Sequence, residues 1–136
     1  METEKNNIIK KGSSARFSKT ISETDVYMFA GICGDFNPVH IDRVKAGETV
    51  FGKQIVHGAL VSSFISTVIG MYMPGPGTIY ISQESSFLKP VYIGDTITAI
   101  VTVEEISIKK RAVLLTEVFN HNGDKVLAGQ AKVLLP

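Results

Sequence analysis

An aspartate and a histidine lie five positions apart in the segment 34–40, which reads Gly-Asp-Phe-Asn-Pro-Val-His. The Asn37-Pro38 pair between them predicts a turn, because proline stiffens the backbone and Asn-Pro favours turn initiation. A carboxylate and an imidazole held close together are groups that proteins use for general acid–base catalysis. Asp35 and His40 are therefore the first candidates for a proton-transfer site.

A second segment that could take part in catalysis is 56–60, which reads Val-His-Gly-Ala-Leu. It lies in a stretch, residues 54–83, that contains no Asp, Glu, Lys or Arg. A helix without charge on any face is a buried helix, so we expect one from about Ala59 to Met73, ended by the Pro-Gly-Pro-Gly run at 74–77. The backbone N–H at such a helix start can stabilise an oxyanion, and Gly58 has no side chain to keep a ligand away.

Another helix is predicted directly before the Asp35 loop. Ser22 can cap its start, acidic residues follow the cap, and Gly34 ends it. Its apolar face is expected to consist of Val26, Phe29, Ala30 and Cys33. Cys33 is thus interpreted as a small buried apolar group rather than a catalytic thiol. A packed helix on one side would keep the loop that carries Asp35 ordered.

Runs rich in Thr, Ile and Val predict antiparallel strands over the rest of the chain. The expected strands are residues 16–21, 78–87, 96–108, 112–120 and 125–135. Asn122-Gly123 is a strong hairpin signal between the last two strands. We predict an α+β fold with residues 1–14 as an N-terminal tail and residues 15–136 as a single domain. One sheet covers only one side of a buried helix, so a homodimer is expected.

The composition excludes several other classes of protein. The 136 residues include 14 Lys and Arg against 13 Asp and Glu, so the net charge of +1 gives no electrostatic case for binding nucleic acid or an anionic membrane. The single cysteine rules out an intramolecular disulfide, and the three histidines show no metal-ligand spacing. The first residues lack the apolar run of a signal peptide. We therefore expect a cytoplasmic protein without a metal or an organic cofactor.

Three segments together resemble a known family. Residues 34–42 are similar to the hydratase-2 motif of the MaoC-like dehydratases, residues 55–60 to the start of their central helix, and residues 86–95 to the strand and turn after it. The resemblance extends from about Phe17 to Pro136 and is greatest to the short R-specific enoyl-CoA hydratases that supply polyhydroxyalkanoate synthesis. It implies the hot-dog fold, in which an antiparallel sheet wraps around one long central helix.

The resemblance also implies an activity, the reversible syn hydration of a trans-2-enoyl-CoA to an (R)-3-hydroxyacyl-CoA. Asp35 and His40 would be the catalytic pair, and Gly58 would supply the amide of the oxyanion hole. Asn37 would shape the turn or orient the pair. The helix positions that would line the acyl pocket are Ser66 and Ile69. Coenzyme A is part of the substrate, so no separate cofactor is implied.

The reaction requires water to lose a proton as it attacks C3, and C2 to gain a proton. Asp35 could act as the base toward water while His40 returns a proton to C2, but the residue types leave open which group performs which transfer. One water held by both groups would deliver oxygen and hydrogen to the same face, which would account for syn addition. General acid–base help of this kind is worth roughly 10²- to 10⁴-fold.

Each of these residues also has a structural interpretation. Asp35 could simply begin a turn, and His40 could be a hydrogen-bonded structural histidine. The two together, followed by the Gly58 helix start, favour catalysis. His57 is expected to bond to the backbone at the helix start rather than to carry protons.

Three other functions stand as alternatives to the hydratase. A dehydratase acting on (R)-3-hydroxyacyl thioesters of acyl carrier protein would use the same chemistry, and the residues do not separate the two carriers. A thioesterase would need a carboxylate aimed at the carbonyl carbon, which the Asp35–His40 spacing does not suggest. A non-catalytic acyl-CoA-binding module would have no need for an acid–base pair. Acyl chain length and physiological direction stay open.

Overall fold

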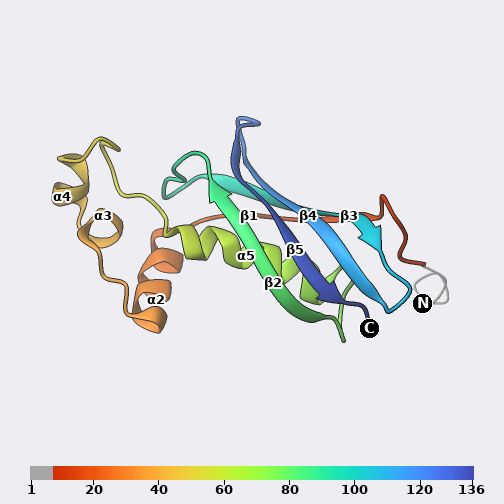
Figure 1. Cartoon of the computed structure of the whole chain (residues 1–136). Coiled ribbons are helices and arrows are strands. Elements are labelled where there is room, and N and C mark those ends of the chain that lie inside the picture. The colour runs from red at the N-terminus through yellow and green to blue at the C-terminus, as the bar shows by residue number, and fades with distance from the viewer. Residues whose placement is uncertain (1–7) are drawn as a thin grey trace.

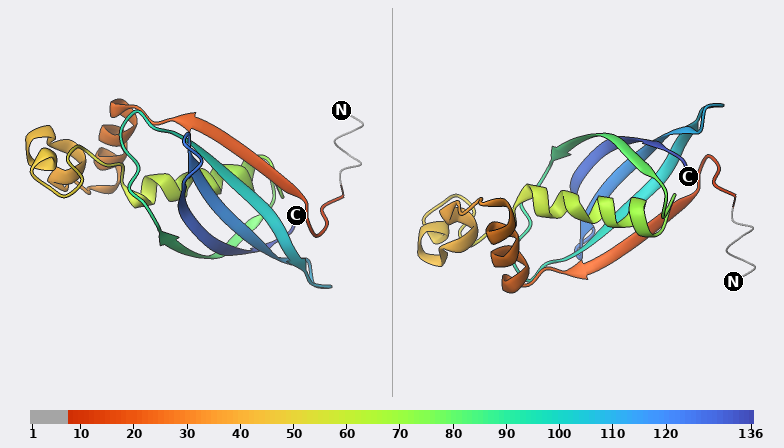
Figure 2. Two further views of the ribbon diagram at one scale, coloured as in Figure 1. Left: turned by 90° about the horizontal axis from the view of Figure 1, so that it is seen from above. Right: turned by 90° about the horizontal axis from the view of Figure 1, so that it is seen from below.

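The computed structural model describes residues 8–136 and shows a five-stranded antiparallel sheet curved around one helix (Figure 1). The strands are β1 (Ser14–Thr20), β2 (Ile79–Phe87), β3 (Thr96–Ile106), β4 (Arg111–Asn120) and β5 (Lys125–Leu134). Their order across the sheet is β1-β3-β4-β5-β2. Helix α5 (Gly58–Met71) lies lengthwise on the concave side, and the other helices gather beyond its N-terminal end (Figure 2). This is the predicted α+β arrangement, and the predicted strand ends are right to within two residues.

The core lies between α5 and the concave face of the sheet. Alternate residues of β3, such as Ala99 and Val101, are fully buried, because successive side chains of a strand point to opposite faces. They meet Ile65 and Val68 of α5, which are also fully buried. Burying each large apolar side chain contributes about 1.5–3 kcal/mol. This packing makes the start of α5 a rigid platform for a site.

Helix α5 begins one residue before the predicted start and ends two residues before the predicted end. The expectation that it is buried on every side is wrong for one face. Ala59, Ser66 and Gly70 are exposed, because the sheet of this chain covers only the opposite face. The exposed face carries no charged residue, which is unusual for a helix surface in contact with water.

Helix α2 (Glu23–Cys33) has the predicted start and end. Ser22 and Asp25 form a reciprocal capping box, and Gly34 ends the helix in the left-handed region at φ 81°. The prediction that Cys33 is buried is wrong, because its side chain is exposed. Residues 31–34 are all exposed, so the last turn of α2 extends past the core and has nothing to pack against.

Two short helices, α3 (Pro38–Ile41) and α4 (Arg43–Gly47), follow the Asp35 loop. His40 therefore lies on a helical turn rather than on the open turn that the sequence suggests. Asn37 caps α3, since its side-chain oxygen accepts the N–H of Val39 at 3.3 Å. This cap gives the loop a defined backbone path.

The predicted tail lies partly outside the described residues, since the structure begins at residue 8. Ile9 packs against the core and β1 begins at Ser14. The domain boundary at residue 14 stays a prediction. None of the helices in residues 8–136 has the length and apolar character needed to cross a membrane.

Candidate active site

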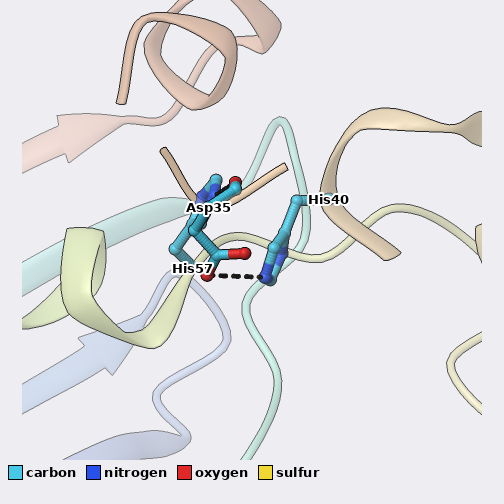
Figure 3. Close-up of side chains that lie close together, drawn as sticks. All are labelled: Asp35, His40 and His57. Carbon is cyan, nitrogen blue, oxygen red and sulfur yellow. Dashed lines mark hydrogen bonds and ion pairs between the residues drawn. The ribbon is translucent and has the colours of Figure 1, made fainter. Parts of the chain in front are cut away.

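Asp35 and His40 face each other at the N-terminal end of α5 (Figure 3). Oδ2 of Asp35 lies 4.0 Å from Nε2 of His40. The Asp35 side chain is 53% exposed and that of His40 only 10%. The carboxylate is thus open to a ligand, while the imidazole is held in the protein.

The carboxylate of Asp35 is held by the backbone that follows it. Oδ1 accepts the N–H of Asn37 at 3.1 Å, which leaves Oδ2 to face His40. The carbonyl oxygen of Asp35 accepts a hydrogen bond from Nε2 of His57 at 2.9 Å. Both ends of this residue are therefore fixed, although its side chain is exposed.

The His40 ring is fixed by a backbone carbonyl. Nδ1 lies 2.8 Å from the carbonyl oxygen of Ile55. A carbonyl can only accept, so Nδ1 carries the proton and the neutral ring has its lone pair on Nε2. Gln54 holds the main chain at the same point by donating to the His40 carbonyl at 2.7 Å. The lone pair of His40 is thus directed toward Asp35.

The gap between Oδ2 of Asp35 and Nε2 of His40 has the right size for one bridging water. At 4.0 Å it is too long for a direct hydrogen bond. A water about 2.8 Å from both atoms would subtend roughly a right angle, which suits its two hydrogens. Both protein atoms are acceptors, so each can take one hydrogen of that water. The pair can therefore hold a water and remove a proton from it.

Gly58 is the first residue of α5. The preceding residue, His57, makes no side-chain capping bond to the helix within the described chain. The first N–H groups of a helix have no intrahelical acceptor, so the Gly58 amide remains free for a ligand oxygen. A Cβ on Gly58 would lie 2.9 Å from the nearest ring carbon of Phe87, so only glycine fits here without moving that ring.

A pocket of about 490 Å³ opens beside Gly58. It is mainly apolar, and its wall includes Val61 of α5 and Phe87 of β2. Lys89 brings a positive charge to the same wall. Asp35 and His40 are not part of the wall, but Gly58 and Ile55, whose carbonyl is bonded to Nδ1 of His40, are. An apolar ligand with a carbonyl group at its end would suit this arrangement.

Comparisons with known proteins show the family of this chain. A family model described as the MaoC-like domain matches residues 4–122. The chain belongs to the MaoC-like dehydratase family. The predicted family is therefore confirmed.

Named relatives of this MaoC-like chain cover nearly all of it. An (R)-specific enoyl-CoA hydratase of Rhodospirillum rubrum is 46% identical, over 94% of this chain and 89% of that protein. A solved (R)-hydratase of Aeromonas caviae, described as involved in PHA biosynthesis, is 40% identical and covers 94% of this chain and 98% of that one, with a TM-score of 0.92. A mitochondrial 3-hydroxyacyl-[acyl-carrier-protein] dehydratase of Arabidopsis thaliana is 35% identical, over 95% and 79%. The structural likeness confirms the predicted hot-dog fold.

The two residues predicted to line the acyl pocket lie elsewhere on α5 of the MaoC-like chain. Ser66 is exposed, and Ile69 is buried in the core at 2% exposure. Neither belongs to the wall of the pocket beside Gly58. Ser66 lies about 12 Å along the helix from that residue, at 1.5 Å per residue. Their role in acyl binding stays a prediction.

The sequence gives little indication of the contacts that His57 makes in the site. The expectation that it bonds to the backbone at the helix start is confirmed, but the acceptor is the carbonyl of Asp35 itself. Its ring also stacks on that of His40, with the centroids 3.9 Å apart. The only signal in the sequence is that His57 precedes Gly58, and spacing along the chain gives no sign of either contact.

Asp35, His40 and His57 each offer one metal-ligand atom, and these atoms lie within 4.8 Å of one another. The two imidazole rings are nearly parallel, at 24°. Ring lone pairs lie in the ring plane, so those of stacked rings run side by side and do not converge on one ion at about 2.0–2.1 Å. The geometry of this MaoC-like site suits proton transfer better than metal binding.

Proposed function

We propose that this MaoC-like protein is an (R)-specific enoyl-CoA hydratase, a hydro-lyase that adds water reversibly to a trans-2-enoyl-CoA. The observation that carries the proposal is the 4.0 Å separation of Asp35 Oδ2 and His40 Nε2 next to the start of α5. Relatives that are 46% and 40% identical bear this name. The product would be the (R)-3-hydroxyacyl-CoA.

The first step is attack of the bridging water on C3. Its oxygen bonds to C3 while one proton passes to Nε2 of His40, and Asp35 holds the second hydrogen and stabilises the imidazolium. This order gives both proton transfers to His40, where the residue types had left open which group performs which transfer. It is favoured because the bond from Nδ1 to the Ile55 carbonyl leaves the lone pair of His40 on Nε2.

The second step returns the proton to carbon. As C3 is attacked, the electrons of the C2=C3 bond move toward the thioester carbonyl, whose oxygen accepts the N–H of Gly58. The enolate then takes the proton of Nε2 at C2. Water and proton come from one side, so the addition is syn. An oxyanion donor of this kind is worth roughly 10²- to 10³-fold in rate.

The apolar pocket beside Gly58 supports a thioester substrate, since it lies where the chain attached to the carbonyl would lie. Coenzyme A is the proposed carrier. The second candidate is a dehydratase acting on acyl carrier protein, which the name of the Arabidopsis thaliana relative favours. The scheme requires no metal or organic cofactor, and this absence, like a cytoplasmic location, stays a prediction.

A homodimer is part of the proposal. Among the described residues, β2 pairs only with β5, so its other edge is free to pair with another strand. Large apolar side chains are exposed there, namely Ile79, Ile81, Phe87 and Leu88. A second copy would cover this edge together with the uncharged exposed face of α5.

The deciding experiment is hydration of crotonyl-CoA by the purified protein, with chiral analysis of the product. We expect (R)-3-hydroxybutyryl-CoA from the wild type and almost none from Asp35→Asn. An (S) product, or equal turnover by the variant, would contradict the proposed site. Turnover of the acyl carrier protein thioester alone would favour the second candidate.

A further inference from the structure

His57 is a buried histidine that the proposed proton transfers do not use. Only 2% of its surface is exposed, although it lies between an exposed loop and the start of α5. Most buried polar side-chain atoms have a hydrogen-bond partner. What those nitrogens contact therefore indicates its role.

One nitrogen of His57 holds the Asp35 loop. Nε2 lies 2.9 Å from the carbonyl oxygen of Asp35, so it must carry the proton and donate. The carboxylate of the same residue is tied to the N–H of Asn37 at 3.1 Å. Fixing the Asp35 carbonyl therefore fixes the peptide from which the carboxylate projects toward His40.

The ring of His57 also supports His40 from behind. The two rings stack with centroids 3.9 Å apart, and Phe29 of α2 packs edge-on against His57, with ring centroids 5.0 Å apart. The stacked His57 ring thus limits movement of the His40 ring on one face, and the bond from Nδ1 to the Ile55 carbonyl limits its rotation.

The second nitrogen of His57 has no hydrogen-bond partner among residues 8–136. His57 is the N-cap residue of α5, where a side chain commonly accepts a helix N–H, yet Nδ1 does not do so. A buried acceptor without a partner reduces stability. This arrangement keeps the first amides of α5, that of Gly58 included, unoccupied by the protein's own side chains.

We propose that His57 is a positioning residue that joins the three parts of the site. The side chain of His57 is hydrogen-bonded to the Asp35 carbonyl and stacked on the His40 ring. A peptide bond joins His57 to Gly58. The carboxylate, the imidazole and the oxyanion amide are thereby held in one geometry. This inference rests on the proposed hydratase function.

The role predicts a particular kinetic change. His57 is not part of the pocket wall, so its loss should leave substrate binding nearly unchanged. The chemical step should suffer, because a misplacement of about 1 Å in a catalytic group can cost on the order of 10²-fold. A fall in kcat with a constant KM is thus the expected pattern, whereas a general loss of folding would reduce the amount of active enzyme.

Two substitutions separate the hydrogen bond from the ring. His57→Phe keeps a ring against His40 but removes the donor, and His57→Gln keeps a donor at a similar reach but removes the ring. We expect kcat to fall about 10- to 100-fold in His57→Phe and by a smaller factor, about 3- to 10-fold, in His57→Gln, which loses only the stacking on His40, with KM within about 3-fold in both. His121→Phe, the same change at an exposed hairpin histidine, is the control and should equal wild type.

A second readout does not depend on activity. The amide of Asn37 is bonded to the carboxylate of Asp35, so its hydrogen exchange reports on the loop. It should exchange faster in His57→Phe than in wild type or His57→Gln. In the wild type, ¹⁵N NMR should find the proton of the neutral His57 ring on Nε2. This measurement does not depend on whether a variant folds.

The outcomes distinguish this inference from the function on which it rests. If His57→Phe kept the kcat and the Asn37 hydrogen exchange of the wild type, the inference would be wrong. It would also be wrong if His57→Gln lost as much kcat as His57→Phe, or if the proton of wild-type His57 lay on Nδ1. If the wild type hydrates no enoyl thioester while Asn37 exchange follows the expected order, the hydratase proposal fails and the positioning contact stands.

Discussion

Two atoms, Oδ2 of Asp35 and Nε2 of His40, carry the proposed proton transfers. Asp35→Asn removes the charge with little change in shape, and His40→Gln removes the titratable nitrogen. Each is expected to lower kcat by at least about 10²-fold, because general acid–base catalysis supplies that much or more. Steady-state kinetics with crotonyl-CoA measures this, with Glu105→Gln, an exposed carboxylate of β3, as the control. Near-full activity of either variant would remove that residue from the mechanism.

Gly58 makes a different prediction, since alanine keeps the amide N–H but adds a Cβ. That Cβ would lie 2.9 Å from the nearest ring carbon of Phe87, an exposed side chain that can move aside. Gly58→Ala should therefore unfold at nearly the wild-type temperature but bind and turn over substrate poorly, because the displaced ring narrows the pocket. Thermal unfolding beside kcat/KM tests this. A large loss of stability with unchanged kcat/KM would contradict it.

At this scale the sequence pointed to the two side chains that the structure brings together, Asp35 and His40, but not to the contacts that hold them. The spacing of Asp35 and His40 and the motif around them were sufficient to single out these two residues as candidates. The acceptor for Nδ1 of His40 is a carbonyl of Ile55, 15 residues later, and a carbonyl is present at every residue. The burial of Cys33 was predicted wrongly because helical spacing shows which residues share a face but not where the core ends.

At the scale of the elements, the stability that the first turn of α2 contributes should depend on pH. Asp25 accepts the backbone N–H of Ser22 and pairs with Lys19, and these contacts lower its pKa below the ordinary value of 3.8. A carboxyl with a lowered folded-state pKa stabilises the fold above 3.8, and this contribution is lost as pH falls through the folded-state pKa. Wild type should therefore be more stable than Asp25→Asn at neutral pH and approach it at lower pH. A difference independent of pH in thermal unfolding would exclude the charged cap as its source.

The pairing of β2 with β5 depends on Gly129. A Cβ at this position would overlap the carbonyl oxygen of Glu84, which is backbone and cannot step aside. Gly129→Ala should destabilise the protein by about 1–3 kcal/mol or more, as overpacking does. Gly31→Ala is the matched control, since no described atom outside the neighbouring helix backbone lies within 4 Å of its Cβ, and in α2 it should stabilise by up to about 1 kcal/mol. Denaturant unfolding measures the free energy of unfolding of both variants. Equal changes in the two would contradict the close contact between Gly129 and Glu84.

The elements that the sequence predicted well are those with local signals. Ser22 and Gly34 mark the ends of α2, and the alternating strands are long enough to show their period. The four residues of α3 are too few to show a helical period, so Asn37-Pro38 was interpreted as an open turn. The uncharged composition of α5 indicated burial on all sides, although one face is exposed within this chain.

For the whole molecule, the free edge of β2 predicts the oligomeric state. A homodimer should have twice the chain mass in light scattering at micromolar concentration. Ile81→Glu places a charge among the exposed apolar residues of that edge, so it should shift the mass toward one chain. Lys132→Glu, a charge change on β5, should remain dimeric. A wild type that is already monomeric would refute the dimer, and a dimeric Ile81→Glu would place the interface elsewhere.

The fold class followed from the sequence because one uncharged helix and several long antiparallel strands allow few arrangements. The sequence also pointed to a second subunit, but only from the argument that one sheet leaves the helix half covered. The edge that such a subunit would use depends on strand order, and that order comes from pairings distant in the chain, such as β1 with β3.

The side chain of His57 makes no hydrogen bond to the first amides of α5, where we propose that the thioester oxygen binds. A thioester oxygen bound there would accept the free N–H groups of the helix start. Substrate binding would then also stabilise the folded protein. A ligand that binds only the folded state adds stability as RT ln(1 + [L]/Kd), about 2.7 kcal/mol at one hundred times Kd. The protein would then be most robust when its metabolite is abundant. A substitution at His57 that caps the helix would stabilise the protein without ligand. It would also remove the proposed activity and the gain in stability on ligand binding.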